Sequence, residues 1–159
     1  MGRIFTVPFT GIVTAAGGDT DLLEALPADD KPITLLGWRI CQTSEVKDAE
    51  EEGLRITVRK MTGTITSGTG TAVTPVDPQY GATAGFTAEC NGATVATTTG
   101  SNTIVEEIGW INRNTPYEFF YPDGRFAPKA RQTEGLFMRL ETTLADDATF
   151  QLTFWVEEE

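Results

Sequence analysis

Residues 148–156 read Ala148-Thr149-Phe150-Gln151-Leu152-Thr153-Phe154-Trp155-Val156, and this stretch decides the predicted fold. Side chains two residues apart in a strand point to the same side, so every second residue from Phe150 to Val156 lies on one apolar face. The opposite face is polar at Gln151 and Thr153, and Trp155 is its exception. The period of two predicts a strand with a buried face, and Trp155 indicates that the second face is covered as well.

The same alternation recurs along the chain between Gly, Pro and Asp turn signals. It predicts strands at residues 3–14, 21–26, 32–43, 53–62, 94–97, 103–112, 117–121, 135–143 and 148–157. About eight or nine short strands with regular turns are typical of a two-sheet sandwich. We therefore predict an all-β fold, a single antiparallel β-sandwich domain over residues 1–159 that is jelly-roll-like. The residues expected in its core are Leu35, Trp38, Ile56, Val58, Leu140, Phe150, Leu152 and Phe154.

The connections between these strands include two predicted turns and one long loop. Residues 28–32 and 145–148 are rich in Asp, whose side chain accepts hydrogen bonds from the following backbone amides, so we predict turns there. The long loop covers residues 62–84, and loops of more than about 15 residues are uncommon in compact domains unless they are functional or loosely ordered. We expect this loop to act as an arm that reaches a neighbouring molecule, with Thr69, Pro75 and Pro78 among its contact residues.

The net charge and the distribution of apolar residues limit the kinds of partner that this protein is expected to bind. The chain has 159 residues, with 12 Lys and Arg against 23 Asp and Glu, which gives a net charge of −11. Such a field repels phosphate, so we expect no nucleic-acid partner. No run approaches the roughly 18 apolar residues of a membrane span, so we expect no membrane partner. The first residues are strand-like rather than an apolar signal segment, so we expect synthesis in the cytoplasm without secretion.

Catalytic chemistry is not visible in the sequence. The chain has 0 His, so it cannot build a Ser-His-Asp or Cys-His arrangement by itself. We predict no enzyme activity, no catalytic residue, no cofactor and no metal. Cys41 and Cys90 are expected to be two buried thiols, with a disulfide as the alternative. The acidic run 45–52 lacks the spacing of a calcium-binding EF-hand loop, which favours a solvated loop over a contact with a basic partner or a cation site.

The densest aromatic stretch covers residues 116–131. In a strand, Tyr117, Phe119 and Tyr121 face one way, while Glu118 and Phe120 face the other. Core packing is the favoured role for one of these faces, and burial of the other against a second subunit is the next, with a glycan platform as a third possibility. Arg125, Lys129 and Arg131 form a basic trio that could pair with acidic loops of a second copy. The candidate partner-binding residues are Tyr117, Phe119, Phe120, Tyr121, Arg125, Phe126, Trp155, Thr69, Pro75 and Pro78.

Several stretches resemble a family of small proteins encoded among the virion structural genes of tailed bacteriophages and prophages. The resemblance covers nearly the whole chain and is carried by structural rather than catalytic motifs. A departure at Cys90-Asn91-Gly92, where relatives carry Asn and Thr, affects the local loop. The motifs are Pro27-Ala28-Asp29-Asp30-Lys31-Pro32-Ile33, Gln42-Thr43-Ser44-Glu45-Val46, Glu51-Glu52-Gly53-Leu54-Arg55, Gly85-Phe86-Thr87-Ala88-Glu89, Met138-Arg139-Leu140 and Phe154-Trp155-Val156-Glu157.

The resemblance implies a non-enzymatic virion protein similar to head decoration (cement) proteins, which are commonly trimeric β-sandwiches or jelly rolls. Such a protein binds and stabilises the assembled head. The implied partners are further copies of the chain in a homotrimer and the major capsid protein. The implied location is the capsid surface of the virion, after synthesis in the host cytoplasm. The alternative is a tail or baseplate-associated module that recognises a host glycan or another virion protein, and a carbohydrate-active enzyme is a weaker rival.

Overall fold

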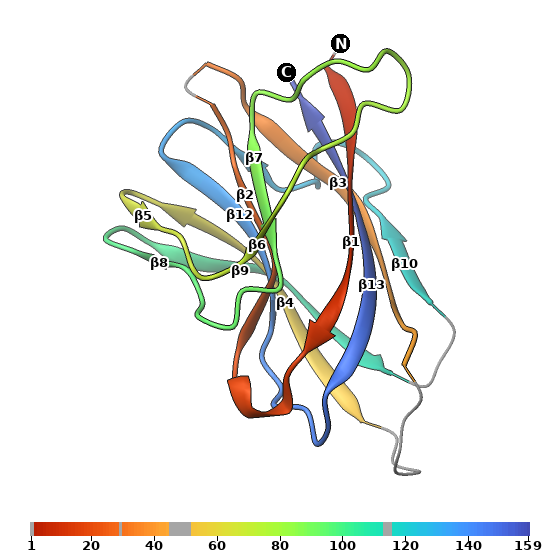
Figure 1. Cartoon of the computed structure of the whole chain (residues 1–159). Helices are drawn as coiled ribbons and strands as arrows, with labels where there is room; N and C mark the ends of the chain where they lie inside the picture. The colour runs from red at the N-terminus through yellow and green to blue at the C-terminus, as the bar shows by residue number, and fades with distance from the viewer. Residues whose placement is uncertain (1, 29, 45–51, 113–115) are drawn as a thin grey trace.

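The computed structural model describes residues 2–28, 30–44, 52–112 and 116–159, and it is an all-β sandwich as predicted (Figure 1). Within these ranges the only helical element is a three-residue 3-10 turn, η1 (Ala15–Gly17). No helix in the described part of the chain has the length and apolarity needed to cross a membrane. Every strand pair is antiparallel.

Two sheets face each other across the core. Sheet A has the order β1-β13-β3-β10, with β11 also paired to β3, and sheet B has the order β6-β7-β2-β12-β4-β9. The strands of sheet A are β1 (Arg3–Val13), β13 (Ala148–Glu158), β3 (Ile33–Gln42), β10 (Tyr117–Phe120) and β11 (Lys129–Ala130). The strands of sheet B are β6 (Thr71–Val73), β7 (Thr87–Cys90), β2 (Thr20–Leu26), β12 (Glu134–Leu140), β4 (Gly53–Thr62) and β9 (Asn102–Ile111). A separate pair joins β5 (Ile65–Thr66) to β8 (Thr97–Thr98).

The order of the main strands is that of a jelly roll. Taken in chain order, the eight principal strands are β1, β2, β3, β4, β9, β10, β12 and β13. The first, eighth, third and sixth of them form sheet A, and the second, seventh, fourth and fifth form the main part of sheet B. This alternation between layers is the double Greek key of a jelly roll. The sequence prediction of a jelly-roll-like sandwich is therefore confirmed.

The core fills the space between the sheets. All eight predicted core residues are buried, and the largest fully buried side chains include Trp38, Phe5, Phe137, Phe150 and Phe154. In β13 the alternation is complete, because each residue of the apolar set from Phe150 to Val156 is buried. The apolar face that the alternation predicts for β13 is thus the face that packs against sheet B.

Residues 63–101 form an insertion between β4 and β9, and here the structure differs from the predicted long loop. The segment 62–84 contains β5 and β6, and β6 pairs with β7 at the edge of sheet B. Val76 then makes two backbone hydrogen bonds of 2.8 Å with Thr6 in β1. The insertion therefore spans from sheet B to the edge of sheet A, and Figure 1 shows its green loop beside the start of β1. Its short strands pair with distant residues, which a local pattern cannot show.

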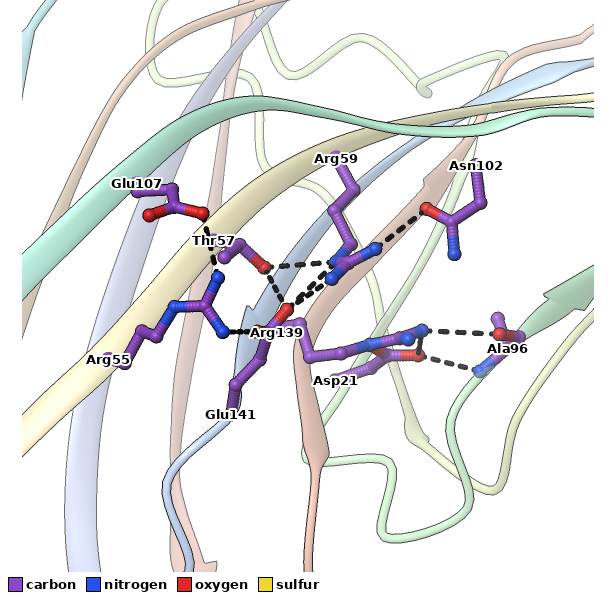
Figure 2. Close-up of polar contacts among 9 residues, drawn as sticks. All are labelled: Asp21, Arg55, Thr57, Arg59, Ala96, Asn102, Glu107, Arg139 and Glu141. Atoms are coloured by element: carbon purple, nitrogen blue, oxygen red, sulfur yellow. Dashed lines mark hydrogen bonds and ion pairs between the residues drawn. The ribbon is translucent and has the colours of Figure 1, made fainter.

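The insertion also covers part of the outer face of sheet B. Met61, Ala96 and Phe137 form a second small core there, against which Leu26 and Ile65 pack. Strand β2 is consequently buried on both faces from Thr20 to Ala25. Its buried Asp21 accepts a hydrogen bond of 2.6 Å from Arg139 Nε and another of 2.7 Å from the backbone amide of Ala96. Because Ala96 belongs to the insertion, Asp21 to β2 and Arg139 to β12, these contacts hold the insertion against sheet B (Figure 2).

Candidate functional site

The aromatic segment of β10 divides between the core and the surface. Tyr117, Phe119 and Tyr121 point inward and pack against the core, where the Phe119 ring centroid lies 4.9 Å from that of Trp38. Tyr121 donates its hydroxyl to Glu106 at 2.5 Å, and burial together with this bond raises the pKa of the phenol. The structure thus gives three of the candidate partner-binding residues a place in the core, which is the role that the sequence favoured for one face.

The other face of β10 contributes to an outer aromatic patch on sheet A. We use this name for Phe120, Trp155, Arg39 and Glu118, which come from three neighbouring strands. Phe120 is 49% exposed, and its ring centroid lies 4.6 Å from that of Trp155. Arg39 lies with its guanidinium carbon 5.8 Å from the Trp155 centroid and pairs with Glu118 at 3.7 Å. The Arg39 guanidinium over the Trp155 ring is a cation–π contact, and an aromatic surface left open to solvent is typical of an interaction surface.

Gly37 makes this patch possible, and sequence analysis did not single it out. It lies directly opposite Phe120 in the β3–β10 pair. A methyl group placed at Gly37 would clash with the backbone carbonyl oxygen of Phe119 and would lie 2.6 Å from Phe120 Cδ1, so the backbone of β10 and the Phe120 ring occupy the space that a side chain would fill. A glycine inside a strand often marks such a close approach, and this is the signal that could have identified the site. Arg39 was also missed, and Glu118 was placed on the same face as Phe120 but not among the candidate residues, because alternation alone does not distinguish a patch residue from a solvated one.

The other candidate residues lie away from the patch strands. Phe126 is 70% exposed in the loop after β10, and Arg125 beside it pairs with Asp123 of the same loop at 2.8 Å. Thr69 is exposed, but its backbone amide donates to Thr94 O at 3.0 Å within the insertion. Of the basic trio, Lys129 pairs with Glu159 at 2.5 Å. Of the acidic run, 45–51 lies outside the described residues, and Glu52 accepts a hydrogen bond from the amide of Ala145 at 2.6 Å.

Pro75 and Pro78 flank a turn built on Asp77. The Asp77 carboxylate accepts hydrogen bonds from the backbone amides of Gln79, Tyr80 and Ala82 at 2.8, 3.0 and 3.2 Å. The bonds from Tyr80 and Gln79 lower the pKa of Asp77. The turn and β7 line a pocket of about 490 Å³, whose walls include Pro75, Val76, Ala84 and Phe86. Pro75 is therefore half-buried in the wall of this pocket, whereas Pro78 is exposed to solvent.

A polar network crosses the outer face of sheet B beside the Asp21–Arg139 pair (Figure 2). Glu141 accepts hydrogen bonds from Arg55 at 2.6 Å, from Thr57 at 2.7 Å and from Arg59. Arg55 also donates to Glu107 in β9 at 2.7 Å. Burial alone would raise the pKa of Glu141, but the hydrogen bonds from Arg59 and Thr57 outweigh it and lower that pKa. The network joins β4, β9 and the end of β12.

The two cysteines are free thiols. Cys90 is buried, which raises the pKa of its thiol to about 12, and Cys41 is partly exposed. Only one of the two is thus buried as predicted. Among the described residues, no group of three or more Asp, Glu and Cys side chains is placed to hold a metal ion.

Comparison with known proteins gives no family. No family model matches the chain, and no curated protein does. One similar solved structure is that of infectious bursal disease virus, Gx strain, with 15% identity over 99% of this chain and 42% of that chain and a TM-score of 0.20. Another is a mutant VP2 protein of the same virus, from derived T=1 particles, with 12% identity over 98% of this chain and 40% of that chain and a TM-score of 0.20. The chain spans about two fifths of the length of these structures, and likenesses this low carry no argument.

Proposed function

We propose that this protein is a non-enzymatic structural component of a bacteriophage virion, a decoration protein that binds the assembled head as a homotrimer and stabilises it. The observation that carries the proposal is the outer aromatic patch, where the rings of Phe120 and Trp155 pack together at an interplanar angle of 43° on the outer face of sheet A. A surface of this kind favours burial against another protein chain. The partners that we propose, further copies of this chain and the major capsid protein, are those that the sequence resemblance to phage virion proteins implies.

A jelly roll suits this role physically, although the same fold also occurs in lectin domains and cupins. Its strands hold the patch residues in fixed positions, so little side-chain freedom is lost when a partner covers them. A protein that binds only the assembled shell stabilises that shell by mass action. The net charge of −11 disfavours adhesion to the packaged genome, which also suits a location on the capsid surface.

The test uses heads of the encoding phage produced without this protein. Purified protein is added to heads and, separately, to tails, and the copies bound are counted after sedimentation. We expect saturable binding to heads at hundreds of copies each. The double variant Phe120→Ser and Trp155→Ser should bind at least about tenfold more weakly, because it loses the aromatic contacts between the copies of the trimer and a monomer lacks the avidity of three linked contacts with the head. Ile12→Ser is the matched control, since Ile12 is 56% exposed in β1 of the same sheet but lies outside the patch.

Three results would contradict the proposal. Binding to tails alone, at a few tens of copies or fewer, would assign the protein to the tail or baseplate. Absence of binding to either structure would remove the virion role. An equal loss of head binding in the Ile12→Ser control would show that the outer aromatic patch is not the surface involved.

A further inference from the structure

One side of the jelly roll is closed by the chain's own insertion. At the edge of sheet A, β1 exchanges two hydrogen bonds with Val76, and Asn91 Nδ2 donates to the carbonyl oxygen of Ile12 at 2.7 Å. The backbone groups of Pro8, like those of Thr6, point away from β13. Pro8 has no amide hydrogen, so it cannot donate a hydrogen bond to a further strand at this edge. At the edge of the main part of sheet B, β2 is covered by β7 and then β6. These are the usual ways in which proteins protect a sheet edge.

The opposite side of the sandwich leaves β9 without such cover. In the described part of the chain, β9 pairs with β4 only. The amide of Asn112 donates to Glu52 O at 3.2 Å, so these two residues form a hydrogen-bonded pair. Along an antiparallel ladder such pairs alternate with pairs whose backbone groups point away from each other. Residues 106, 108 and 110 therefore bond toward β4, and the backbone groups of Glu107, Gly109 and Ile111 point away from it. Strand β9 contains no Pro and no Lys, and a bulge near Val105 limits the regular stretch to its second half.

The outer face of sheet B is hollowed beside this edge. A pocket of about 520 Å³ is lined by Gly53, Arg55, Glu107, Gly109 and Ile111, together with three further residues of β4 and β9. A methyl group placed at Gly53 or Gly109 would meet no atom within 4 Å. Gly37 differs, because the ring of Phe120 from the neighbouring strand lies over it. In this fold a strand glycine can thus receive an aromatic ring from the next strand, and at Gly109 no described strand supplies one.

We propose that the edge of β9 binds an extended, basic segment of another protein, which adds a seventh strand to sheet B and places a large apolar side chain over Gly109. Backbone groups of Glu107, Gly109 and Ile111 give the hydrogen bonds of the new pair, and the hollow accepts the side chain opposite Gly109. Ile104, Val105 and Ile111, which are between 37% and 46% exposed, lose contact with water at the same edge. The proposal stands whether or not the partner belongs to a virion.

Charge selects a basic partner rather than a second copy. Glu107 is more than half exposed at the rim of the hollow, and its ion pair of 2.7 Å with the similarly exposed Arg55 leaves it open to a second cation. A Lys or Arg on the added strand would lie directly opposite this carboxylate, which is a favourable cross-strand pair. Two copies of the chain each carry a net charge of −11. Pairing two β9 strands about Glu107 would oppose like charges, and pairing them about Gly109 would place a second glycine beside the hollow and leave it unfilled. Complementarity therefore favours a positively charged segment.

The test uses the whole protein and a synthetic peptide, acetyl-Thr-Lys-Val-Trp-Val-Lys-Thr-amide, whose symmetry allows either strand direction. Binding is followed by the backbone amide resonances of the isotope-labelled protein. We expect the amides of Glu107, Gly109 and Ile111 to shift and to gain protection from exchange. Peptides with Ala in place of Trp, or with Glu in place of both Lys, should bind at least about tenfold more weakly.

Two variants test the edge itself. Gly109→Pro removes an outward amide, and Gly109→Trp fills the hollow at a position with free space, so each should weaken peptide binding at least about tenfold. Thr10→Pro and Thr10→Trp place the same residues at an outward position on the protected β1 edge and should stay within about twofold of the wild type. If Gly109→Pro does not fold, the Gly109→Trp variant decides the matter. Absence of peptide binding, or an equal loss in the Thr10 variants, would overturn the proposal. So would self-association of the wild type that Gly109→Trp abolishes, because the occupant would then be a second copy.

Discussion

The Asp21–Arg139 ion pair shows how single charged residues hold this fold together. Both side chains are buried, and Arg139 also donates to Ala96 O at 3.2 Å, so the pair has hydrogen-bond partners on two sides. A buried charge without a partner is costly, because it has lost its water and gained nothing in return. Removing one partner should therefore destabilise the fold by more than the pair itself stabilises it, because the remaining charge is left buried and unpaired.

The first prediction follows from this asymmetry. Asp21→Ala should lower the free energy of unfolding by about 3 to 5 kcal/mol, because it leaves Arg139 buried and unpaired. The double variant with Arg139→Met should recover part of that loss, since both charges are then removed. Urea unfolding measures both values. Arg39→Met breaks an exposed pair and should cost less than about 1 kcal/mol, and a similar loss for Asp21→Ala would contradict the prediction.

The second prediction concerns the pH dependence of stability. The pKa of Glu141 is lowered in the folded state, so its contribution is present above the pKa of the unfolded chain and is lost as the pH falls through the lowered value. Glu141→Gln should therefore show a smaller loss of stability between about pH 5 and pH 3 than the wild type.

Glu24 provides the control of opposite sign. Burial raises the pKa of its carboxyl, so the folded state takes up this proton at a higher pH than the unfolded chain does. Acidification through that range therefore favours folding at this position, and Glu24→Gln should make the acid loss steeper. Thermal unfolding across this pH range measures both slopes, and equal slopes for the two variants would contradict both assignments.

At the scale of elements, the sequence predicts the long strands well and the short ones poorly. The alternation in β13 and in β10 reveals which residues face the core, since each strand has one apolar face. It cannot reveal β6, whose three residues stand between glycine and proline and are held by pairing with β7. The contact between Phe120 and Trp155 was also beyond prediction, although both were candidates. It requires β3 to lie between their strands with Gly37 at the crossing.

The Asp-rich turns show the same limit. Asp147 was expected to bind the amides that follow it, but its carboxylate accepts from the distant amide of Ala15 at 2.8 Å. Asp77, which the prediction did not single out, makes the local bonds expected of a turn Asp. The chemistry of the residue was predicted correctly, whereas its partner depends on which segments the fold brings together.

The third prediction belongs to the Asp77 turn. Asp77→Ala should speed hydrogen exchange at the amides of Gln79, Tyr80 and Ala82, since these lose their acceptor. Exchange in the buried strands β4 and β12 should stay unchanged, because the core is not touched. Asp123→Ala is the matched control, and its effect should be confined to the loop of Arg125. Faster exchange throughout sheet B in Asp77→Ala would show that the turn supports the core.

At the scale of the whole molecule, the two sides of the sandwich carry different kinds of surface. The insertion closes the side formed by β1 and β2, while the outer aromatic patch and the β9 edge remain open to solvent. We place self-association at the patch because it combines apolar rings with the Arg39–Glu118 pair, a pattern suited to an interface core with a polar rim.

The fourth prediction is the oligomeric state. Sedimentation equilibrium should give about three times the chain mass of 17.3 kDa, because homo-oligomers commonly form closed symmetric rings. Phe120→Ser together with Trp155→Ser should give a monomer, and Ile12→Ser should leave the trimer intact. A monomeric wild type at micromolar concentration would contradict the prediction.

The place of β13 between β1 and β3 also sets the order in which the chain can fold. Strand β1 pairs with a segment that begins 135 residues after its own last residue, at Ala148, so their contact closes almost the longest loop available. Loop closure of this length makes folding slow, and a ribosome adds only about 5 to 20 residues per second. Sheet A therefore cannot be completed until synthesis has passed β13. Until then β1 and β3 each lack their main partner, and the nascent β1 waits for about 7 to 27 seconds with an unpaired edge exposed to aggregation.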